Sequence, residues 1–456
     1  MNNSSGIKRE PLIHISRRND ITGWKTAIVK GISILIALIL CGLISSIFAP
    51  GSFFKFYEYA FQGTFYSLNT TLATLWNAAL LLLIASAITP AFKKKFWNIG
   101  AEGQVLMGCF GAAIVMKFIA PYLPNVIALL LMLVAAIVFG AIWAFIPAVF
   151  KAIFNTNETL FTLMMNYIAM GFIAAFSLKF KATGSTALGV LNADTHAGWI
   201  PEIFGYKYII SIVVIILIVV GIWFFLKYSK QGYEIAVLNG SVRTAEYVGI
   251  NVKQVIMRTL IMAGALCGIA GFLIVAGASH TVSDTSAGGR GFTAVMISWL
   301  GHFNPLEMAL YAFLCAFVTT GSSSAAGNLG YSGEVASVLS GLFFMLILTS
   351  EFFVNFKVQV NVKKNRVTDD SGFDYYGLSG PFSLLLCIIP ITSWIFGFVT
   401  RFREKRWIPA IVRVIFGNSI LWLLDLICMV SKRSIFRIEN YFKGNEQSSK
   451  AKEAEQ

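Results

Sequence analysis

The segment GGRGFTAVMISWLG, residues 288–301, decides how many times this chain crosses a membrane. It is apolar like a membrane helix, but it is only fourteen residues long and begins with two glycines. At about 1.5 Å per residue a helix of this length reaches roughly 21 Å, whereas the hydrocarbon layer is roughly 30 Å thick. We therefore predict a half-helix with an extended glycine-rich lead-in. Such broken backbone is stable at membrane depth only where protein buries it or water fills the space beside it.

The composition of the whole chain is that of an integral membrane protein. Of its 456 residues, 57% are hydrophobic and 13% are charged, and long apolar runs recur along almost the entire length. Helices satisfy their backbone hydrogen bonds internally, so an all-α fold is expected. Besides 288–301, we predict nine spans near 31–49, 72–92, 104–120, 126–149, 160–178, 208–226, 255–276, 306–321 and 333–350.

The net charge of +14 indicates membrane topology and does not indicate nucleic-acid binding. The lysines and arginines lie at the ends of apolar blocks, where positive charge marks the cytoplasmic side. Basic residues before the first span place the amino end in the cytoplasm, and those in 357–366 should lie there too. Nine spans would put 357–366 outside, so a tenth crossing is required. Only 288–301 is available for it.

A second glycine-rich lead-in, NIGAEGQ at 98–104, comes before the span in the other half of the core. A pair of glycine-interrupted segments in corresponding positions is a sequence indicator of a transport site. The alternative is that these glycines only allow helices to pack closely. The pair Gly264 and Gly268, in a GxxxG arrangement, fits that alternative better.

The sequence offers no catalytic or metal-binding pattern. GxSxG and HExxH are absent, the six cysteines lie within apolar segments, and none of the four histidines forms an i, i+4 ligand pair. We expect neither an enzyme nor a metal centre. Because no Gly-Lys dipeptide occurs, the chain has no phosphate-binding loop of the GxxxxGK[ST] type. If transport consumes ATP, another polypeptide hydrolyses it.

The internal loop 227–254 is expected to contain a short amphipathic helix. Ser241 can cap its first turn, Val242, Ala245 and Val248 form an apolar stripe, and Gly249 can end it. Such a helix on the cytoplasmic surface suits the groove of a partner protein. The alternative is a loop that rests on the inner surface of its own chain.

Four ordered motifs resemble one transporter family. They are WNIGAEGQVLMGCFGAA (97–113), NETLFTLMMNYIA (157–169), GYEIAVLNGSVRTAEYVGINVKQ (232–254) and GRGFTAVMISWLGHFNPLEM (289–308). Together they resemble the permease subunits of ABC importers of the branched-chain amino acid, sugar and nucleoside group, most of all its nucleoside and simple-sugar subgroup. The resemblance covers about residues 26–356.

The resemblance implies a ten-span core like that of type II ABC importers, in a bacterial cytoplasmic membrane. It implies three partners: a cytoplasmic ATPase that holds ATP and Mg, a second permease, either different from this one or identical to it, and an extracytoplasmic substrate-binding lipoprotein. No cofactor is expected on this chain. The internal loop would couple to the ATPase, with Gly232, Glu234, Asn239, Ala245, Gly249 and Ile250 at the motif positions.

The translocation path is expected near the two breaks and the fifth span. Apolar walls with a few polar groups suit an uncharged, hydrogen-bonding solute, with a nucleoside first and a simple sugar next. Glu102 could instead stabilise a helix start through the helix dipole. The candidate residues of the path are Asn98, Gly100, Glu102, Gly103, Gln104, Asn157, Glu158, Asn166, Gly289 and Gly291.

The rest of the chain departs from the family pattern. Residues 1–25 are predicted to be a cytoplasmic tail before the permease domain 26–356. After it we predict a basic linker 357–372, two extra apolar helices in 373–431, and a charged, disordered tail 432–456.

The competing function is an ion-coupled secondary transporter, which also uses glycine-broken helices. That class more often carries ionisable residues deep in its spans. The importer hypothesis predicts an ATPase, a second permease and a binding lipoprotein among co-purifying proteins.

Overall fold

The computed structural model describes residues 13–17, 23–93, 96–181, 184–185, 187–360 and 398–399. The chain divides into two units, Met1–Asn361 and Val362–Gln456, and the description below concerns the first. The predicted linker beyond 360, the two extra helices and the charged tail lie outside the described residues, apart from Phe398 and Val399. They stay predictions.

Helices account for almost all of the first unit, as predicted. In the described residues nine are long and apolar enough to cross a membrane, and a tenth, α11, is the short helix expected after the glycines. The nine are α1 (Gly23–Phe48), α3 (Leu68–Phe92), α4 (Ala101–Phe118), α5 (Asn125–Phe154), α6 (Glu158–Phe180), α7 (Ile209–Tyr228), α10 (Val252–Ile274), α12 (Pro305–Leu329) and α13 (Gly333–Asn355). The protein is therefore a multi-pass α-helical membrane protein.

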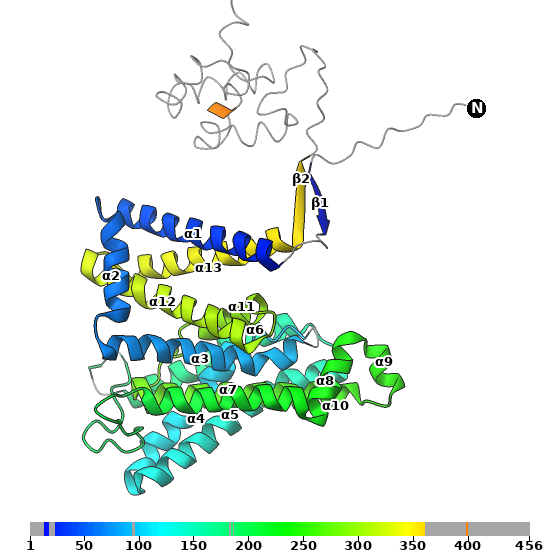
Figure 1. The fold of residues 1–456 in the computed structure, drawn as a ribbon. Coiled ribbons are helices and arrows are strands. Elements are labelled where there is room, and N and C mark those ends of the chain that lie inside the picture. Colours follow the sequence, from blue (N-terminus) through cyan, green and yellow to red (C-terminus); the bar gives the residue numbers. More distant parts are fainter. Residues whose placement is uncertain are drawn as a thin grey trace, which may run out of the picture. The chain divides into compact units, whose positions relative to one another are not determined.

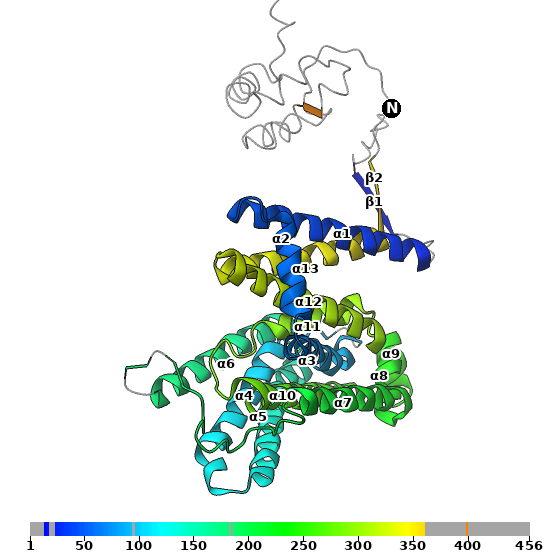
Figure 2. The ribbon, with the colours of Figure 1, turned by 60° about the vertical axis from the view of Figure 1, so that its left-hand side comes forward.

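Shorter elements join these helices. They are α2 (Phe53–Phe65), η1 (Ala120–Tyr122), α8 (Lys230–Gly240), α9 (Val242–Tyr247), η2 (Val275–Ser279) and α11 (Arg290–Leu300). The long helices lie roughly along one direction, and α2 crosses it between α1 and α3 (Figures 1 and 2). With the amino end inside, α2 lies at the predicted outer side, and α8 and α9 lie at the cytoplasmic side.

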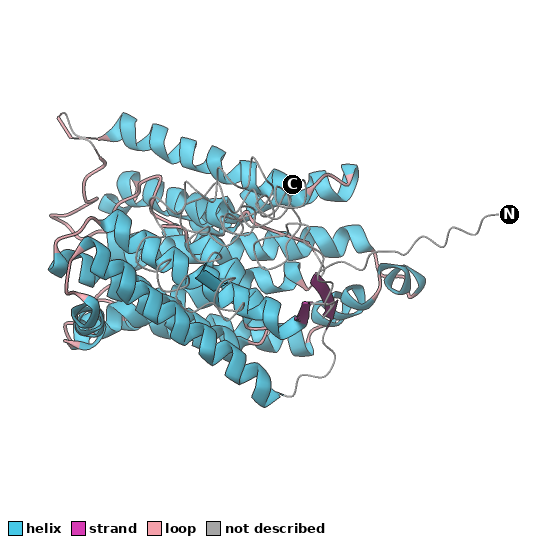
Figure 3. Cartoon of the chain, turned by 90° about the horizontal axis from the view of Figure 1, so that it is seen from above, coloured by secondary structure: helices cyan, strands magenta, loops and turns pink. Residues whose placement is uncertain are grey.

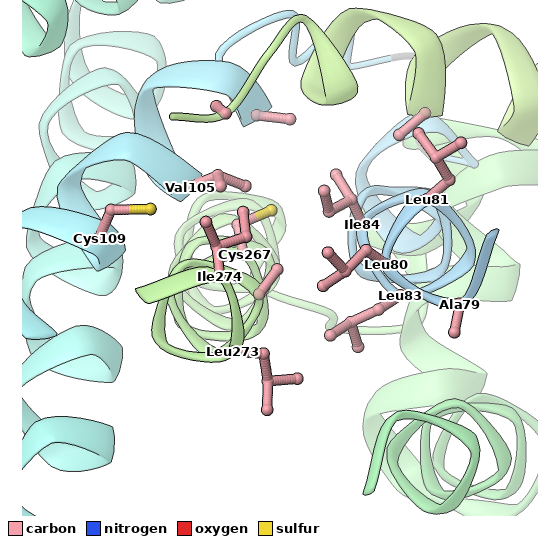
Figure 4. Close-up of a cluster of buried hydrophobic side chains, with 14 of the residues drawn as sticks. Ala79, Leu80, Leu81, Leu83, Ile84, Val105, Cys109, Cys267, Leu273 and Ile274 are labelled. Carbon is pink, nitrogen blue, oxygen red and sulfur yellow. The ribbon is translucent and has the colours of Figure 1, made fainter. Parts of the chain in front are cut away.

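The centre of the unit is an apolar core shared by α3, α4 and α10. Leu80 and Ile84 of α3 face Cys267 and Ile274 of α10, and all four are essentially inaccessible to solvent (Figure 4). This core fixes the helices on which the site is built.

Small residues let α4, α5 and α10 approach closely. A side-chain carbon on Gly268 would lie 2.2 Å from the Ala136 carbonyl oxygen of α5, and one on Gly108 of α4 would lie 2.6 Å from Gly268. The GxxxG pair of the sequence is therefore a packing surface, as predicted.

The structure adds a strand pair that the sequence analysis did not predict. β1 (Ile13–Arg17) pairs antiparallel with β2 (Phe356–Val360), with Ile15 opposite Val358 (magenta in Figure 3). Each strand has only five residues, and their partners lie more than three hundred positions apart, so neither gives a periodic signal of its own. Beside them, the Lys30 ammonium of α1 lies 3.3 Å from the Glu351 carboxylate of α13.

The predicted outer loop between α6 and α7 packs on η2 around a buried histidine. The His280 ring stacks on the Trp199 ring at 3.7 Å between centroids and is 4% exposed. Two backbone bonds hold the loop there, from Leu191 N to the His280 oxygen and from Ile200 N to the Ala276 oxygen. Burial, together with the nearby Lys207 ammonium, lowers the pKa of the His280 imidazole to about 4.

We expect this loop to loosen in acid. An unfolded histidine takes up a proton near its ordinary pKa of 6.5, whereas folded His280 resists protonation until about pH 4. Stability is therefore lost as pH falls from 6.5 to 4, by up to about 3 kcal/mol. Hydrogen exchange of residues 187–207 measured against pH checks this. His280→Phe should remove the dependence and His196→Asn should retain it; equal pH dependence in wild type and His280→Phe would contradict it.

Candidate functional site

The amino ends of α4 and α11 meet, and the Glu102 carboxylate joins them. Its Oε1 accepts a hydrogen bond from Gly289 N and its Oε2 accepts one from Gly291 N, each at 2.7 Å. Glu102 lies in the first turn of α4, so one side chain satisfies the free N–H groups of a helix that begins 188 residues later. The two glycine-rich breaks of the sequence form one junction.

This junction lies at membrane depth. Two helices give its depth. Asn166, which bonds to the junction, lies about 12 Å along α6 from the cytoplasmic start of that helix, at 1.5 Å per residue. Arg290 of α11 lies about 15 Å from the cytoplasmic end of α11 at Leu300. Both estimates place the junction near the middle of a hydrocarbon layer roughly 30 Å thick.

Electrostatics and close packing both fix Glu102 in place. Its charge lies at the positive ends of two helix dipoles, and the Arg290 guanidinium interacts with it as well. Gly291 allows the approach, because a side-chain carbon there would lie 2.3 Å from Glu102 N. Gly289, with φ of +73°, supplies the left-handed turn into α11. The carboxylate is 2% exposed and serves as the cap of α11.

Three more of the predicted residues hold the start of α4. Asn166 Oδ1 accepts from Gly103 N at 2.9 Å, and its Nδ2 donates to the Ile99 oxygen at 3.0 Å. Asn98 Oδ1 accepts from Gly100 N at 3.0 Å and from Gln104 Nε2 at 3.4 Å. Asn98, Gln104 and Asn166 are buried. In this conformation they hydrogen-bond to backbone groups and to one another.

Asn157 and Glu158 lie elsewhere, at the cytoplasmic end of α6. Asn157 caps the helix by accepting from Leu160 N at 3.2 Å. The Glu158 carboxylate pairs with the Lys151 ammonium of α5 at 2.6 Å. Their observed contacts stabilise the turn between α5 and α6.

A cavity of about 340 Å³ opens beside the junction, and six of its nine lining residues carry polar side-chain groups. Arg290 projects into it from α11, and its Nη2 donates to Asn77 Oδ1 of α3 at 2.8 Å. Its volume is at the lower end of the range of about 300–1,000 Å³ for small-molecule sites. The lining residues are Asn77, Leu81, Gly288, Arg290, Thr293, Ala316, Thr319, Thr320 and Ser323.

The polar face of α12 was not among the predicted site residues. The run TTGSSS, 319–324, lies inside a span, and Thr319, Ser323 and Gly327 recur at four-residue intervals on an exposed face. The hydroxyls of Thr319 and Ser323 donate to carbonyl oxygens of α12 itself, and a face of hydroxyl groups and glycine is better suited to water or to another protein than to lipid. Six consecutive small or hydroxyl residues in a membrane helix were a signal that could have identified it.

Comparison with known proteins agrees with this geometry. Residues 70–348, from α3 to α13, match the family described as branched-chain amino acid transport system / permease component. The chain belongs to this family. It is the membrane permease subunit of an ABC transport system, and the relatives that it matches are transport permeases.

The relatives of this permease include transporters of several solutes. It is 26% identical to the guanosine ABC transporter permease NupP of Bacillus subtilis, over 69% of this chain and 92% of that protein. It is 27% identical to the nucleoside ABC transporter permease NupB of Lactococcus lactis, over 64% and 83%. A glucose ABC transporter permease of Haloferax volcanii is 26% identical over 63% and 78%. No solved structure matches the chain significantly.

The permease presents α8 and α9 at its predicted cytoplasmic side, where the sequence predicted a coupling helix. Ser241 Oγ caps α9 by accepting from Thr244 N at 3.3 Å, and Gly249, with φ of +83°, ends it. Ala245 is completely buried against Ile235, Leu238 and Val255, so it packs within the chain.

The exposed apolar residues of α9 and its end are Val242, Tyr247 and Val248. The predicted stripe is thus divided, because Ala245 fastens α9 to α8 while its neighbours remain free for a partner. Gly232 packs against the Leu226 carbonyl, Glu234 and Ile250 are half-buried, and Asn239 and Gly249 are exposed.

Proposed function

We propose that this permease carries nucleosides, and simple sugars next, through the cavity beside the junction of α4 and α11. The observation that carries the proposal is the lining of that cavity. Asn77, Thr293, Thr319, Thr320 and Ser323 line it with amide and hydroxyl groups. The hydroxyls of Thr293, Thr319 and Ser323 donate to carbonyl oxygens of their own helices and keep lone pairs that can accept from a solute. Such groups suit a solute with many hydroxyls.

Arg290 adds one positive charge to the lining of the cavity, but its guanidinium already makes hydrogen bonds within the protein. It donates to Asn77 Oδ1 and to the backbone oxygens of Ser286 and Ala287. The nearby Glu102 carboxylate partly balances its charge. The cavity is therefore suited to an uncharged solute with hydrogen-bonding groups. Relatives that are named guanosine, nucleoside and glucose permeases support this solute class.

We infer the predicted partners on the same grounds. The exposed polar face of α12 would border a water-filled space, and a second permease beside it would keep lipid out of that space. A cytoplasmic ATPase would hold ATP and Mg and contact α9, and a binding lipoprotein would deliver solute to the outer side of a bacterial cytoplasmic membrane. ATPase closure would move α9 and α8 and change which side of the cavity is open. Glu102 and Asn166 would hold the junction rigid during this motion.

The function is tested by uptake into proteoliposomes that contain the complete importer. Wild type should accumulate labelled guanosine with ATP inside, and an ionophore should not abolish uptake. The double variant Thr320→Val/Ser323→Val should lose about tenfold or more in uptake, because two solute hydrogen bonds of about 1 kcal/mol each are removed. Thr349→Val, on an exposed face of α13, is the matched control and should transport normally.

Uptake that needs an ion gradient and no ATP would favour the secondary-transporter alternative. Normal uptake of guanosine and of glucose by the double variant would remove the cavity from the path. Unlabelled glucose added to the guanosine uptake assay separates the two solute classes. Strong inhibition of guanosine uptake by glucose would show that simple sugars, and not nucleosides, are the preferred solutes.

The coupling surface gives a separate prediction. Tyr247 is 93% exposed on α9, so Tyr247→Asp should leave the permease folded but weaken its contact with the ATPase. An interface tyrosine can contribute on the order of 2 kcal/mol, so we expect about a tenfold or greater loss of solute-stimulated ATP hydrolysis. Tyr66→Asp, an exposed tyrosine at the predicted outer side, is the control and should hydrolyse ATP normally. Unchanged hydrolysis in Tyr247→Asp would show that α9 is not the contact.

A further inference from the structure

A second hollow, separate from the solute cavity, lies at the predicted cytoplasmic end of the spans. It is a groove of about 320 Å³ lined by α7 and by the start of α12, and α3, which packs against both helices, contributes its last turns. It shares no lining residue with the solute cavity. The residues that line it are Ser86, Thr89, Lys93, Val219, Ile222, Trp223, Leu226, Lys227, Phe303, Asn304, Pro305 and Met308.

Two lysines give the groove its charge. Lys93 directly follows α3 and Lys227 is the next-to-last residue of α7, so both ammonium groups lie at the cytoplasmic ends of their helices. Neither is in an ion pair with a carboxylate in the described part of the chain. Lys227 Nζ instead lies 4.8 Å from the centre of the Trp223 ring. Two cations facing one hollow without a carboxylate favour an anionic occupant.

The opposite end of the groove is apolar. Val219 and Ile222 of α7 line it toward the middle of the membrane. The neighbouring outward faces of α7, at Ile216 and Leu217 for example, are apolar and exposed, as they are on a helix against lipid. Ser86, 2% exposed at the groove, has a hydroxyl oxygen without a hydrogen-bond partner. The groove thus changes from cationic to apolar along its length, with one unpaired hydroxyl.

We propose that this groove binds one anionic phospholipid of the cytoplasmic leaflet. Its phosphate lies between Lys93 and Lys227, its glycerol esters lie near Ser86, and one acyl chain follows Val219 and Ile222. Basic pockets between spans on the cytoplasmic side are suited to anionic head groups, and tryptophan prefers the membrane interface. A free phosphate or nucleotide would match the lysines but would leave the apolar wall without a partner. The bound lipid braces α7, which packs on the rest of the unit mainly through α3.

The test uses the complete importer in nanodiscs of phosphatidylcholine and phosphatidylglycerol, with retained lipids counted by native mass spectrometry. Wild type should retain phosphatidylglycerol in preference to phosphatidylcholine. Each lysine near an anionic surface contributes about fivefold in affinity, so Lys93→Gln/Lys227→Gln should lower that preference roughly 10- to 30-fold. Lys230→Gln/Lys253→Gln, two exposed lysines of the same side outside the groove, is the matched control and should retain it.

A third variant keeps both lysines of the groove and fills the apolar end of the groove with a larger side chain. Ile222→Trp should also release the lipid, which tests the groove even if the double lysine variant assembles poorly. Equal retention by wild type and Ile222→Trp would overturn the proposal. So would displacement of the lipid by millimolar inorganic phosphate, which would identify a free anion as the occupant. Crosslinks from a photoreactive group at Trp223 to a second permease, with none to lipid, would identify a protein cover and overturn it too.

Discussion

Glu102→Ala should abolish solute uptake and destabilise the permease. The substitution leaves the N–H groups of Gly289 and Gly291 without the carboxylate that accepts both at 2.7 Å. Hydrogen bonds to a charged group are worth about 1.5–3 kcal/mol each, so the loss of two should be about 3–6 kcal/mol. That is a large fraction of the stability of a typical domain. Thermal unfolding of the purified complex and uptake into proteoliposomes measure the two effects.

Two further variants separate the contact between helices from the dipole effect. Glu102→Gln keeps one acceptor oxygen, so it should retain part of the stability and less of the uptake. Glu334 also lies in the first turn of a span but is exposed, so Glu334→Ala removes only a favourable charge at a helix start. If Glu102→Ala is as stable as Glu334→Ala, the carboxylate does not hold α11.

Gly291→Val should prevent the two helix ends from meeting. A side-chain carbon at Gly291 would lie 2.3 Å from Glu102 N and 2.6 Å from its Cα, and backbone cannot move aside as a flexible side chain can. Overpacking of a core usually costs about 1–3 kcal/mol, and we expect at least the upper value here. The yield of assembled permease and its unfolding temperature should both fall.

Gly171→Val is the matched control for Gly291→Val. Gly171 lies within α6, and a side-chain carbon there would meet no atom within 4 Å. It should assemble like wild type. Equal yields and unfolding temperatures for the two valine variants would show that Gly291 is not needed for close approach.

The sequence predicted the two breaks because each carries a strong local signal, but it did not predict that they meet. GGRG before a short apolar helix and NIGAEGQ before another are both unusual in a span, and counting charged ends required the extra crossing. The possible role of Glu102 at a helix start was also predicted, but both of its hydrogen bonds go to the start of α11 and not to the helix that carries Glu102. A cross-helix partner 187 residues away leaves no local pattern.

Other features depend on tertiary contacts that no periodicity reveals. Asn166 was a predicted path residue, yet in this structure both ends of its amide bind the backbone around Gly103. Ala245 has the spacing of an exposed stripe, but α8 covers it. The cavity combines α3, α11 and α12, so its lining is not contiguous in sequence. The pair of β1 and β2 joins two segments too short to be recognised separately.

The central claim is that the polar face of α12 lines a water-filled solute path, and thiol labelling tests it most directly. One variant, Ser323→Cys, places a thiol on that face, and a second, Leu217→Cys, places one on the exposed apolar face of α7. The unmodified permease measures background labelling, which should be low because the native cysteines of the described residues are buried. A charged, membrane-impermeant thiol reagent should label Ser323→Cys in the assembled importer, and transported solute should slow that labelling. Leu217→Cys should stay unlabelled. Ser323→Cys as unreactive as Leu217→Cys would contradict the account.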